Sequence, residues 1–466
     1  MPAADLRTRL QRLRAYKQRA PEPPPEASPA AARPQPTQAN ELPGERIAAG
    51  RGAYQLIETR YPLSQQHGPR ILAEAFAHDP ATAARLARDE ALGRADPRAL
   101  AFIDTETTGL MGGAGTLVFL IGVGVCEDDA FVVRQYFMSD PACERALFQA
   151  LVADLTPRAG WITFNGKAFD LPLIESRLTM TRQRGTLGQR PHLDLLMPAR
   201  RLYRGRLPTC ALGDIERGVF KIAREDDDVP GWLIPQLYNE YLRTGNPREM
   251  RRVIYHNTVD ILSMVTLTAH LLEMFATPLN VAGRGTNPHA GTGDEGRSRA
   301  ALAASAEPSR AGGRRSQERP IAGSVVGRPE PVAEDLLRLA CWHADQGRAA
   351  EAEAAFRRAL DGRLELPDRA LALTRLAALL KRQDRRAEAV PLWEQLASFS
   401  LDDAGPFVEL AKYYEWHGGD LGRAEAWTRR ALALVGGLPG GWRRDLAVAG
   451  LNQRLARVRA KLARSA

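Results

Sequence analysis

The pattern of apolar and polar positions divides residues 99–276 into several strands and the helices that follow them. Three runs rich in β-branched and aromatic residues predict an antiparallel meander, because short glycine-containing or acidic segments separate them. These runs are residues 99–104, 116–125 and 131–138. The spacing of apolar residues in 141–155 predicts a helix, and the apolar run 161–164 predicts a fourth strand. The pattern is that of a mixed α/β domain.

Acidic side chains stand where several of these elements begin or end. Asp104 and Glu106 end the first strand, and residues two apart on a strand point to the same face. Asp170 follows a β-rich run and a glycine turn, at the expected start of a helix. His256 and Asp260 lie four residues apart in a segment with helical spacing, so they share one face of that helix. Together these positions supply four carboxylates and one imidazole.

Such a set suits the hydrolysis of a phosphodiester. Adjacent like charges are tolerated with a cation between them, and two divalent ions about 3.5–4 Å apart can clamp the attacking and leaving oxygens. Oxygen ligands suit Mg²⁺ or Mn²⁺ better than zinc. The residues therefore predict phosphoryl chemistry. Two simpler interpretations stay open: the acidic tetrapeptide at 104–107 can be a solvated strand end, and His256 can be an ordinary helix residue.

Residues of about 100 to 275 resemble the DEDD exonuclease superfamily of ribonuclease-H-like proteins, and more closely its bacterial YprB-like branch. The resemblance rests on the acidic strand end and on the segments 161–170, 212–216 and 224–235. It implies an α/β ribonuclease-H-like domain, with a mixed sheet flanked by helices. It also implies a metal-dependent 3′–5′ exonuclease that uses two Mg²⁺ or Mn²⁺ ions on DNA or RNA.

The resemblance assigns roles by position. The metal ligands would be Asp104, Glu106, Asp170 and Asp260; the catalytic residues would be His256, Glu106 and Tyr255; the substrate contacts would be Thr107, Asn165, Lys167 and Phe169. The superfamily places its base as a Tyr four residues before the last Asp or as a His five before it, whereas here Tyr255 lies five before and His256 four before. We favour His256, since an imidazole of pKa about 6.5 accepts a proton at neutral pH.

Three other segments have simpler interpretations. Residues 112–115 lack the Lys and Ser or Thr of a phosphate loop, so they predict a hairpin connection. The acidic run 225–228 precedes a Pro-Gly break and is interpreted as a solvated cap. His192 and Asp194 are expected to shape the wall of the cleft rather than to bind an ion.

Length and composition limit the class of protein. The 466 residues, 44% of them apolar, are enough for two folded units. The net charge of +9 suits a nucleic-acid partner, since Lys and Arg contacts with phosphates dominate non-specific binding. Arginines cluster between residues 177 and 206, where they form either a basic rim facing the substrate or a solvated loop. Four cysteines without paired spacing argue against disulfides and zinc, so a cytoplasmic protein is expected. No apolar run is expected to span a bilayer, and no membrane partner is expected.

The segments around the α/β domain differ from it in composition. Residues 1–50 predict a basic helix and a disordered Pro- and Ala-rich tether. Residues 51–98 predict a β-rich segment with a helix at 81–92, packing on the nuclease domain at 99–276. Residues 277–330, rich in Gly, Pro, Ser and Arg, predict a flexible linker.

Residues 331–466 repeat a pattern of small residues. The repeating segments are 347–360, 385–397 and 422–434, with Ala352, Ala389 and Ala426 in corresponding places. Their steps are close to the tetratricopeptide period of about 34 residues, so each repeat would be a pair of helices. A plain helical bundle is the alternative. Lacking a carboxylate or His constellation, this region is expected to hold a protein partner.

Two functions remain in view from the sequence. The first is a metal-dependent nuclease, a 3′–5′ exonuclease acting by a two-metal-ion mechanism and tethered to a tetratricopeptide-like module. The alternative is a nucleic-acid-binding scaffold whose ribonuclease-H-like domain is weakly active or inactive and whose repeats recruit partners. Metal binding distinguishes the two.

Overall fold

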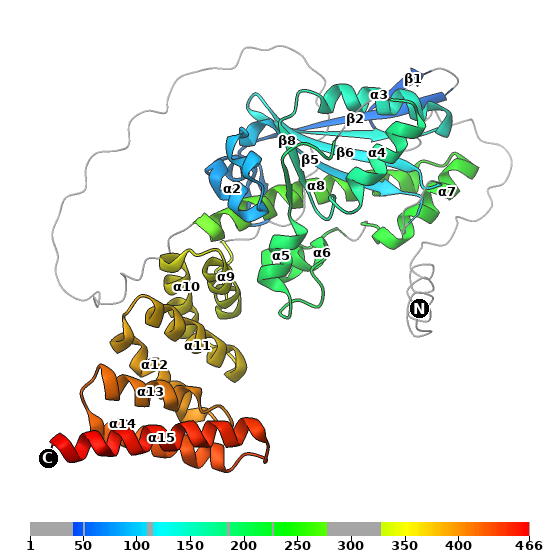
Figure 1. Cartoon of the computed structure of the whole chain (residues 1–466). Coiled ribbons are helices and arrows are strands. Elements are labelled where there is room, and N and C mark those ends of the chain that lie inside the picture. Colours follow the sequence, from blue (N-terminus) through cyan, green and yellow to red (C-terminus); the bar gives the residue numbers. More distant parts are fainter. Residues whose placement is uncertain are drawn as a thin grey trace, which may run out of the picture. The chain divides into compact units, whose positions relative to one another are not determined.

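A computed structural model describes residues 41–49, 52–109, 115–183, 187–225, 228–276 and 328–465 (Figure 1). Four segments interpreted from the sequence lie wholly or mainly outside these ranges. They are the N-terminal basic helix, the Pro- and Ala-rich tether, the connection at 112–115 and the linker at 277–330.

Seven strands form one mixed sheet in the order β1-β2-β7-β6-β5-β8-β9. Their bounds are β1 (Glu45–Ala49), β2 (Gly52–Pro62), β5 (Leu100–Thr107), β6 (Val118–Glu127), β7 (Ala130–Phe137), β8 (Gly160–Thr163) and β9 (His192–Asp194). β5, β6 and β7 pair antiparallel and confirm the predicted meander. β8 pairs parallel with β5, and β9 parallel with β8. Parallel pairing brings the C-terminal ends of these three strands to one edge of the sheet.

The segment before β5 contributes to this sheet. β2 pairs antiparallel with β7, and β1 with β2. A two-stranded ribbon of β3 (Gln66–His67) and β4 (Arg70–Ile71) follows, and then α2 (Pro80–Ala87). The predicted helix at 81–92 is therefore too long. It ends because Arg88 takes a left-handed φ of 55°, and a short 3-10 helix, Glu90–Arg94, comes next.

Helices cover both faces of the sheet. Asp104 and Thr105 are adjacent in β5 and so point to opposite faces. Asp104 contacts Asn257 of α8 (Arg248–Ala276), whereas Thr105 contacts Asp170 of α4 (Asp170–Met180). α8 and α4 therefore lie on opposite faces (Figure 1). The other α-helices described in this part of the chain are α3 (Glu144–Leu155), α5 (Leu196–Tyr203), α6 (Leu212–Ile215) and α7 (Ile234–Thr244).

α8 is the central helix of the core. It approaches β6 so closely that a Cβ on Gly124 would lie 2.7 Å from Cγ2 of Ile261. By length and composition α8 could also cross a membrane, so the expectation that no apolar run is long enough was wrong. However, 83% of its most apolar window is buried inside the protein. The apolar residues of α8 thus pack in the core of the α/β domain.

Seven helices are described beyond residue 328. They are α9 (Ala333–Asp345), α10 (Ala349–Asp361), α11 (Leu366–Arg382), α12 (Arg386–Phe399), α13 (Gly405–Trp416), α14 (Leu421–Gly436) and α15 (Trp442–Ser465). Ala352, Ala389 and Ala424, each the fourth residue of its helix, are fully buried. Ala426 is exposed, so the correspondence predicted for the third repeat was wrong by two residues. The buried small residue is the one that allows close helix packing.

α9 packs against the α/β domain. Leu339 and Trp342 of α9 are buried in the same apolar cluster as residues of α8. The ring centroids of Trp342 and Phe275 are 4.9 Å apart. At the edge of this contact, Arg206 Nε donates a hydrogen bond of 2.7 Å to Asp335 Oδ1. The first helix after the predicted linker thus shares a core with the domain before it.

Candidate active site

The first acidic residue of β5 is held in place by α8. Asn257 Nδ2 donates to Asp104 Oδ2 at 2.8 Å, and Gln135 Nε2 donates to Asn257 Oδ1 at 2.8 Å. Asn257 is fully buried, and it fits because Gly122, the partner of Asp104 in β6, has no side chain. A Cβ on Gly122 would lie 2.3 Å from Asn257 Oδ1. This contact orients the Asp104 carboxylate.

Asn257 was not anticipated from the sequence. The available signal was the pair Gly122 and Gly124 in an otherwise bulky strand, since glycines in a strand interior mark the close approach of another element. That signal indicates that something packs there, but it does not identify the residue.

Glu106, His256 and Asp260 form the tightest group of potential ligands among the described residues. One ligand atom from each lies within 4.8 Å of the others. His256 Nε2 is 3.9 Å from Glu106 Oε1 and 3.5 Å from Asp260 Oδ2. The three side chains are only 12–18% exposed. The structure therefore brings the end of β5 and one face of α8 together, as their spacing predicted.

Asp170 approaches from the other face of the sheet. It is the first residue of α4 and is buried. Thr105 Oγ1 donates to Asp170 Oδ1 at 2.5 Å. Asp104 and Asp170 stand outside the tight group, although the charges of Asp170, Glu106 and Asp260 all raise the pKa of Asp104. The four predicted carboxylates, which come from β5, α4 and α8, are thus electrostatic neighbours.

The site carries an excess of buried negative charge. Burial raises the pKa of Asp104 well above its usual range, and the other carboxylates add to the effect. Burial likewise raises the pKa of Glu106 to about 8 and that of Asp170 to about 6. Such shifts arise because burial and neighbouring carboxylates disfavour the charged forms, in spite of the nearby His256 and Arg224. A set of hard oxygen donors with this excess of negative charge fits a divalent ion such as Mg²⁺ or Mn²⁺.

His256 is more basic than an ordinary imidazole. Burial alone would lower its pKa, but Asp260, a hydrogen bond to Asp228 and Glu106 outweigh that effect and raise it to about 9. His256 Nδ1 donates to Asp228 Oδ1 at 2.8 Å. The expectation of a free base with a pKa of about 6.5 was therefore wrong for this state, because the surrounding carboxylates favour the protonated ring. Neutralising those carboxylates would lower the pKa of His256, so that the ring could accept a proton at neutral pH.

Two residues that contact this site come from the segment after α6. Arg224 makes two hydrogen bonds of 2.7 Å to Glu216 and also pairs with Asp260. Asp228 is only 17% exposed and belongs to the acidic run interpreted as a solvated cap. For Asp228 that interpretation was wrong, since it orients His256. The motif segments 212–216 and 224–235 contained these residues, but no local pattern placed them beside α8.

Tyr255 does not join this group. Its hydroxyl is buried and has no hydrogen-bond partner in the described part of the chain. Burial raises the pKa of Tyr255 to about 12, and nearby Glu225 and Asp228 add to the effect. A phenol with this pKa stays protonated at neutral pH, and its hydroxyl makes no hydrogen bond to Glu106 or Asp260. Of the exchanged pair Tyr255 and His256, only His256 thus faces the carboxylates Glu106 and Asp260.

The predicted substrate contacts fall into two sets. Asn165 and Lys167 are exposed, in a turn whose backbone N–H groups donate to Asp194 at 2.8 and 3.1 Å. Asp194 thus anchors the turn through two backbone hydrogen bonds. Phe169, the residue before α4, is half-buried. Thr107 is buried and donates to Gly109 O at 2.8 Å, so its hydroxyl is already used within the turn.

Part of the predicted basic rim is structural. Arg177 is buried and pairs with Glu144, with Arg177 Nη2 donating to Oε2 at 2.7 Å. Arg190 Nη2 donates to Thr156 O at 2.9 Å. These arginines fix neighbouring elements, so not every member of the arginine cluster faces a substrate.

The mixed sheet flanked by helices is a ribonuclease-H-like fold, which is a nuclease-type fold. Residues 101–272 match the family described as the RNase_H superfamily. Over 382 residues the chain is 28% identical to "Uncharacterized protein YprB" of Bacillus subtilis (strain 168), a match that covers 81% of this chain and 79% of that protein. The mixed sheet flanked by helices, followed by an all-helical region, confirms the predicted fold class.

One solved structure, "Crystal structure of PcrH from Pseudomonas aeruginosa", matches 27% of this chain and 90% of its own. The identity is 19% and the TM-score is 0.23. A likeness this weak supports no conclusion about function.

Proposed function

We propose that this protein is a metal-dependent nuclease that hydrolyses phosphodiester bonds of DNA or RNA, and that it acts as a 3′–5′ exonuclease of the DEDD type. The observation that carries the proposal is the concentration of buried carboxylates with raised pKa values around His256, at the end of β5. Perturbed acidic groups gathered beside a histidine are typical of catalytic sites. The RNase_H match over the same residues supports this class of activity.

The metal ligands would be Asp104, Glu106, Asp170 and Asp260, supplying oxygen donors for two Mg²⁺ or Mn²⁺ ions. When bound, such ions supply charge stabilisation and an activated water for phosphodiester hydrolysis. The protein's own part is to hold these carboxylates at fixed positions. Asn257 orients Asp104, and Thr105 orients Asp170, each through a hydrogen bond.

His256 would accept or guide the proton of the attacking water. Asp228 holds Nδ1, so Nε2 is the nitrogen that faces Glu106 and Asp260. Once the charge of these carboxylates is balanced, the pKa of His256 would fall from about 9 toward neutrality, where a base works best. Asn165 and Lys167, exposed on the neighbouring turn, would contact the strand.

One observation favours the alternative function, a nucleic-acid-binding scaffold with little or no activity. The Arg224 guanidinium pairs with Asp260 and so places a positive charge where a cation would bind. A divalent ion must compete with this pair or share the carboxylate. Titration of Mn²⁺ into the protein by calorimetry separates the two functions, because a scaffold does not need to bind the ion.

The proposal also covers the helical region and the location of the protein in the cell. α9 to α15 would form a tetratricopeptide-like module that binds a protein partner, as the succession of helix pairs suggests. The four cysteines are free, which suits the cytoplasm we propose.

The direct test uses single-stranded DNA and RNA labelled at the 3′ or the 5′ end, incubated with Mn²⁺. Stepwise shortening from the 3′ end is expected for the wild type and should be absent in Asp104→Ala. His256→Ala should lower the rate by about 10²–10⁴-fold, the usual contribution of general acid–base catalysis. Binding without cleavage of any strand would support the scaffold instead.

A further inference from the structure

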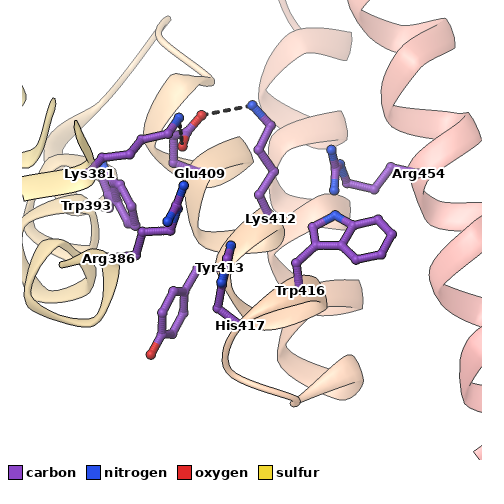
Figure 2. A pocket seen from close by; sticks show the side chains of 9 residues that line it. All are labelled: Lys381, Arg386, Trp393, Glu409, Lys412, Tyr413, Trp416, His417 and Arg454. Carbon is purple, nitrogen blue, oxygen red and sulfur yellow. Dashed lines mark hydrogen bonds and ion pairs between the residues drawn. The ribbon is translucent and has the colours of Figure 1, made fainter. Parts of the chain in front are cut away.

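A groove far along the chain from the acidic site is lined by cations and aromatic rings (Figure 2). It lies between residues of α11, α12, α13 and α15 and has a cavity volume of about 290 Å³. Figure 2 shows Lys381, Lys412 and Arg386 around one side and Trp416 beside Arg454 on the other. The function proposed above does not use this groove.

Positive charge exceeds negative charge along the groove. Lys381 and Lys412 share a single acid, Glu409, at 2.6 and 2.9 Å. Behind the groove, one buried acid, Glu415, accepts hydrogen bonds from three cations. The three cations on Glu415 are Arg454, Arg457 and Lys461. Glu409 and Glu415 are each outnumbered, whereas Arg386 pairs with Asp384, an acid that is 84% exposed. The groove therefore has more cations than acids, which suits an anionic ligand.

Flat rings stand among these cations. Trp416 is 57% exposed although it is a large apolar side chain. Lys461 Nζ lies 3.4 Å from the centroid of its ring, and Arg457 Cζ lies 5.6 Å from the same centroid. Tyr413 and His417 stack with centroids 6.3 Å apart and planes inclined by 22°. Exposed rings beside cations can stack on unpaired bases while the cations contact phosphates.

We propose that this groove binds single-stranded nucleic acid, with bases on Trp416 and the Tyr413–His417 pair and phosphates on Arg386 and Lys412. An acidic peptide would satisfy the cations but would not use the exposed part of the Trp416 ring. A duplex would satisfy the phosphates but would keep its bases stacked on each other. The identity of this strand as the substrate rests on the proposed function, whereas the binding itself does not require an intact acidic site.

The test is fluorescence anisotropy of a labelled 20-nucleotide oligo(dT) or oligo(U) with the full chain in EDTA, which prevents metal-dependent cleavage. Trp416→Ala should weaken binding about tenfold, in line with the loss of one stacked base. Trp416→Phe should keep most of the affinity, and Trp416→Leu should not, because leucine fills space without an aromatic face. Far-UV circular dichroism checks that each variant is folded.

The chain offers matched controls outside the groove. Trp442 is 72% exposed and has Arg443 5.2 Å from its ring centroid, so Trp442→Ala removes a similar cation–ring pair elsewhere. Arg386→Gln should lower the slope of log affinity against log salt by about 0.7, the value for one phosphate contact to a single strand. Arg430→Gln, an exposed arginine of α14 over Trp427, should leave the slope unchanged.

Two results would overturn the inference. One is equal binding by the wild type and all groove variants. The other is groove-dependent binding of a labelled oligo-glutamate peptide with no binding of either strand, which would make the groove a peptide site. The proposed function fails separately: a wild type that binds strands through the groove but never cleaves them would refute the nuclease and leave the groove intact.

Discussion

The acidic site beside β5 has an excess of carboxylates, whereas the groove beside α13 has an excess of cations. In the acidic site, burial and mutual repulsion raise the pKa of Glu106 to about 8. Near the groove, burial alone would raise the pKa of Glu415, but Arg457, Lys461 and Arg454 outweigh it and lower the pKa to about 2. Carboxylates outnumber cations in the first region, and cations outnumber carboxylates in the second. The first region is thus suited to a metal ion and the second to an anion.

This difference predicts opposite consequences for removing one acid. Glu415→Ala leaves three cations, 15–41% exposed, without their buried partner and should destabilise the protein by about 1–3 kcal/mol. Urea unfolding followed by circular dichroism measures the change. Glu415→Gln keeps the shape and an acceptor oxygen, so it serves as the matched variant and should cost less. A loss below about 1 kcal/mol for Glu415→Ala would show that solvent already screens these cations.

A second change tests how tightly the acidic site is supported. Gly122→Ala places a Cβ 2.3 Å from Asn257 Oδ1 and should destabilise the α/β domain by about 1–3 kcal/mol, the usual cost of overpacking. It should also release Asp104 from Asn257 and reduce cleavage. Gly115→Ala is the control, because its Cβ would meet nothing within 4 Å. Unchanged stability in Gly122→Ala would mean that α8 can shift without cost.

Removing an acid from the acidic site should stabilise the folded protein, the opposite of the effect expected at Glu415. Asp104→Asn relieves repulsion among largely buried carboxylates, which raises the pKa of Asp104, and should therefore stabilise the metal-free protein. In the wild type, Mn²⁺ at 100 times its Kd should add about 2.7 kcal/mol, and the variant should lose this gain. Thermal unfolding in EDTA and in Mn²⁺ measures both. Asp445→Asn, at an exposed position of α15, should change neither.

The two regions should also lose stability at opposite ends of the pH scale. The folded pKa of Glu106 is raised, so its contribution is present below pH 4.5 and is lost as the pH rises through about 8. His256, with a pKa of about 9, acts in the same direction between about pH 6.5 and 9. The pKa of Glu415 is lowered, so its contribution is present above pH 4.5 and is lost toward pH 2.

Hydrogen exchange read by mass spectrometry resolves the two regions separately. In EDTA, protection of β5 and α8 should fall from pH 6 to 9, after correction for intrinsic exchange rates, while α13 and α15 should be unaffected. Below pH 4.5, protection of α13 and α15 should fall while that of β5 and α8 should not. Mn²⁺ should remove the alkaline loss, and an alkaline loss that persists in saturating Mn²⁺ would contradict the assignment of these carboxylates as ligands.

The smallest effect is expected at Tyr255. Its hydroxyl has no hydrogen-bond partner among the described residues, so Tyr255→Phe should change stability by less than about 0.5 kcal/mol. The cleavage rate should stay within about twofold, in contrast to the loss expected for His256→Ala. Single-turnover kinetics of the two variants compare them directly. A large loss in Tyr255→Phe alone would make Tyr255 the catalytic residue of the pair.

Much of the α/β domain follows from short-range patterns in the sequence. The meander, the start of α4 at Asp170 and the shared face of His256 and Asp260 all depend on periods of two and 3.6 residues, which local backbone geometry imposes. Helix ends were less certain: α2 stops at Arg88 because one left-handed residue breaks it. In the helical region, the small residue that is buried proved to be Ala424 rather than Ala426.

By itself, the sequence determined the class of the fold and the carboxylates with their histidine. Only the tertiary structure decided what surrounds them. Arg224, Asp228 and Asn257 contact the site, but their positions along the chain do not predict that they lie close to it. Their hydrogen bonds form only when α8 packs on the sheet. The groove around Trp416 likewise needs four helices side by side. Local periodicity fixes which way a side chain points, whereas packing fixes what it meets and hence its charge state.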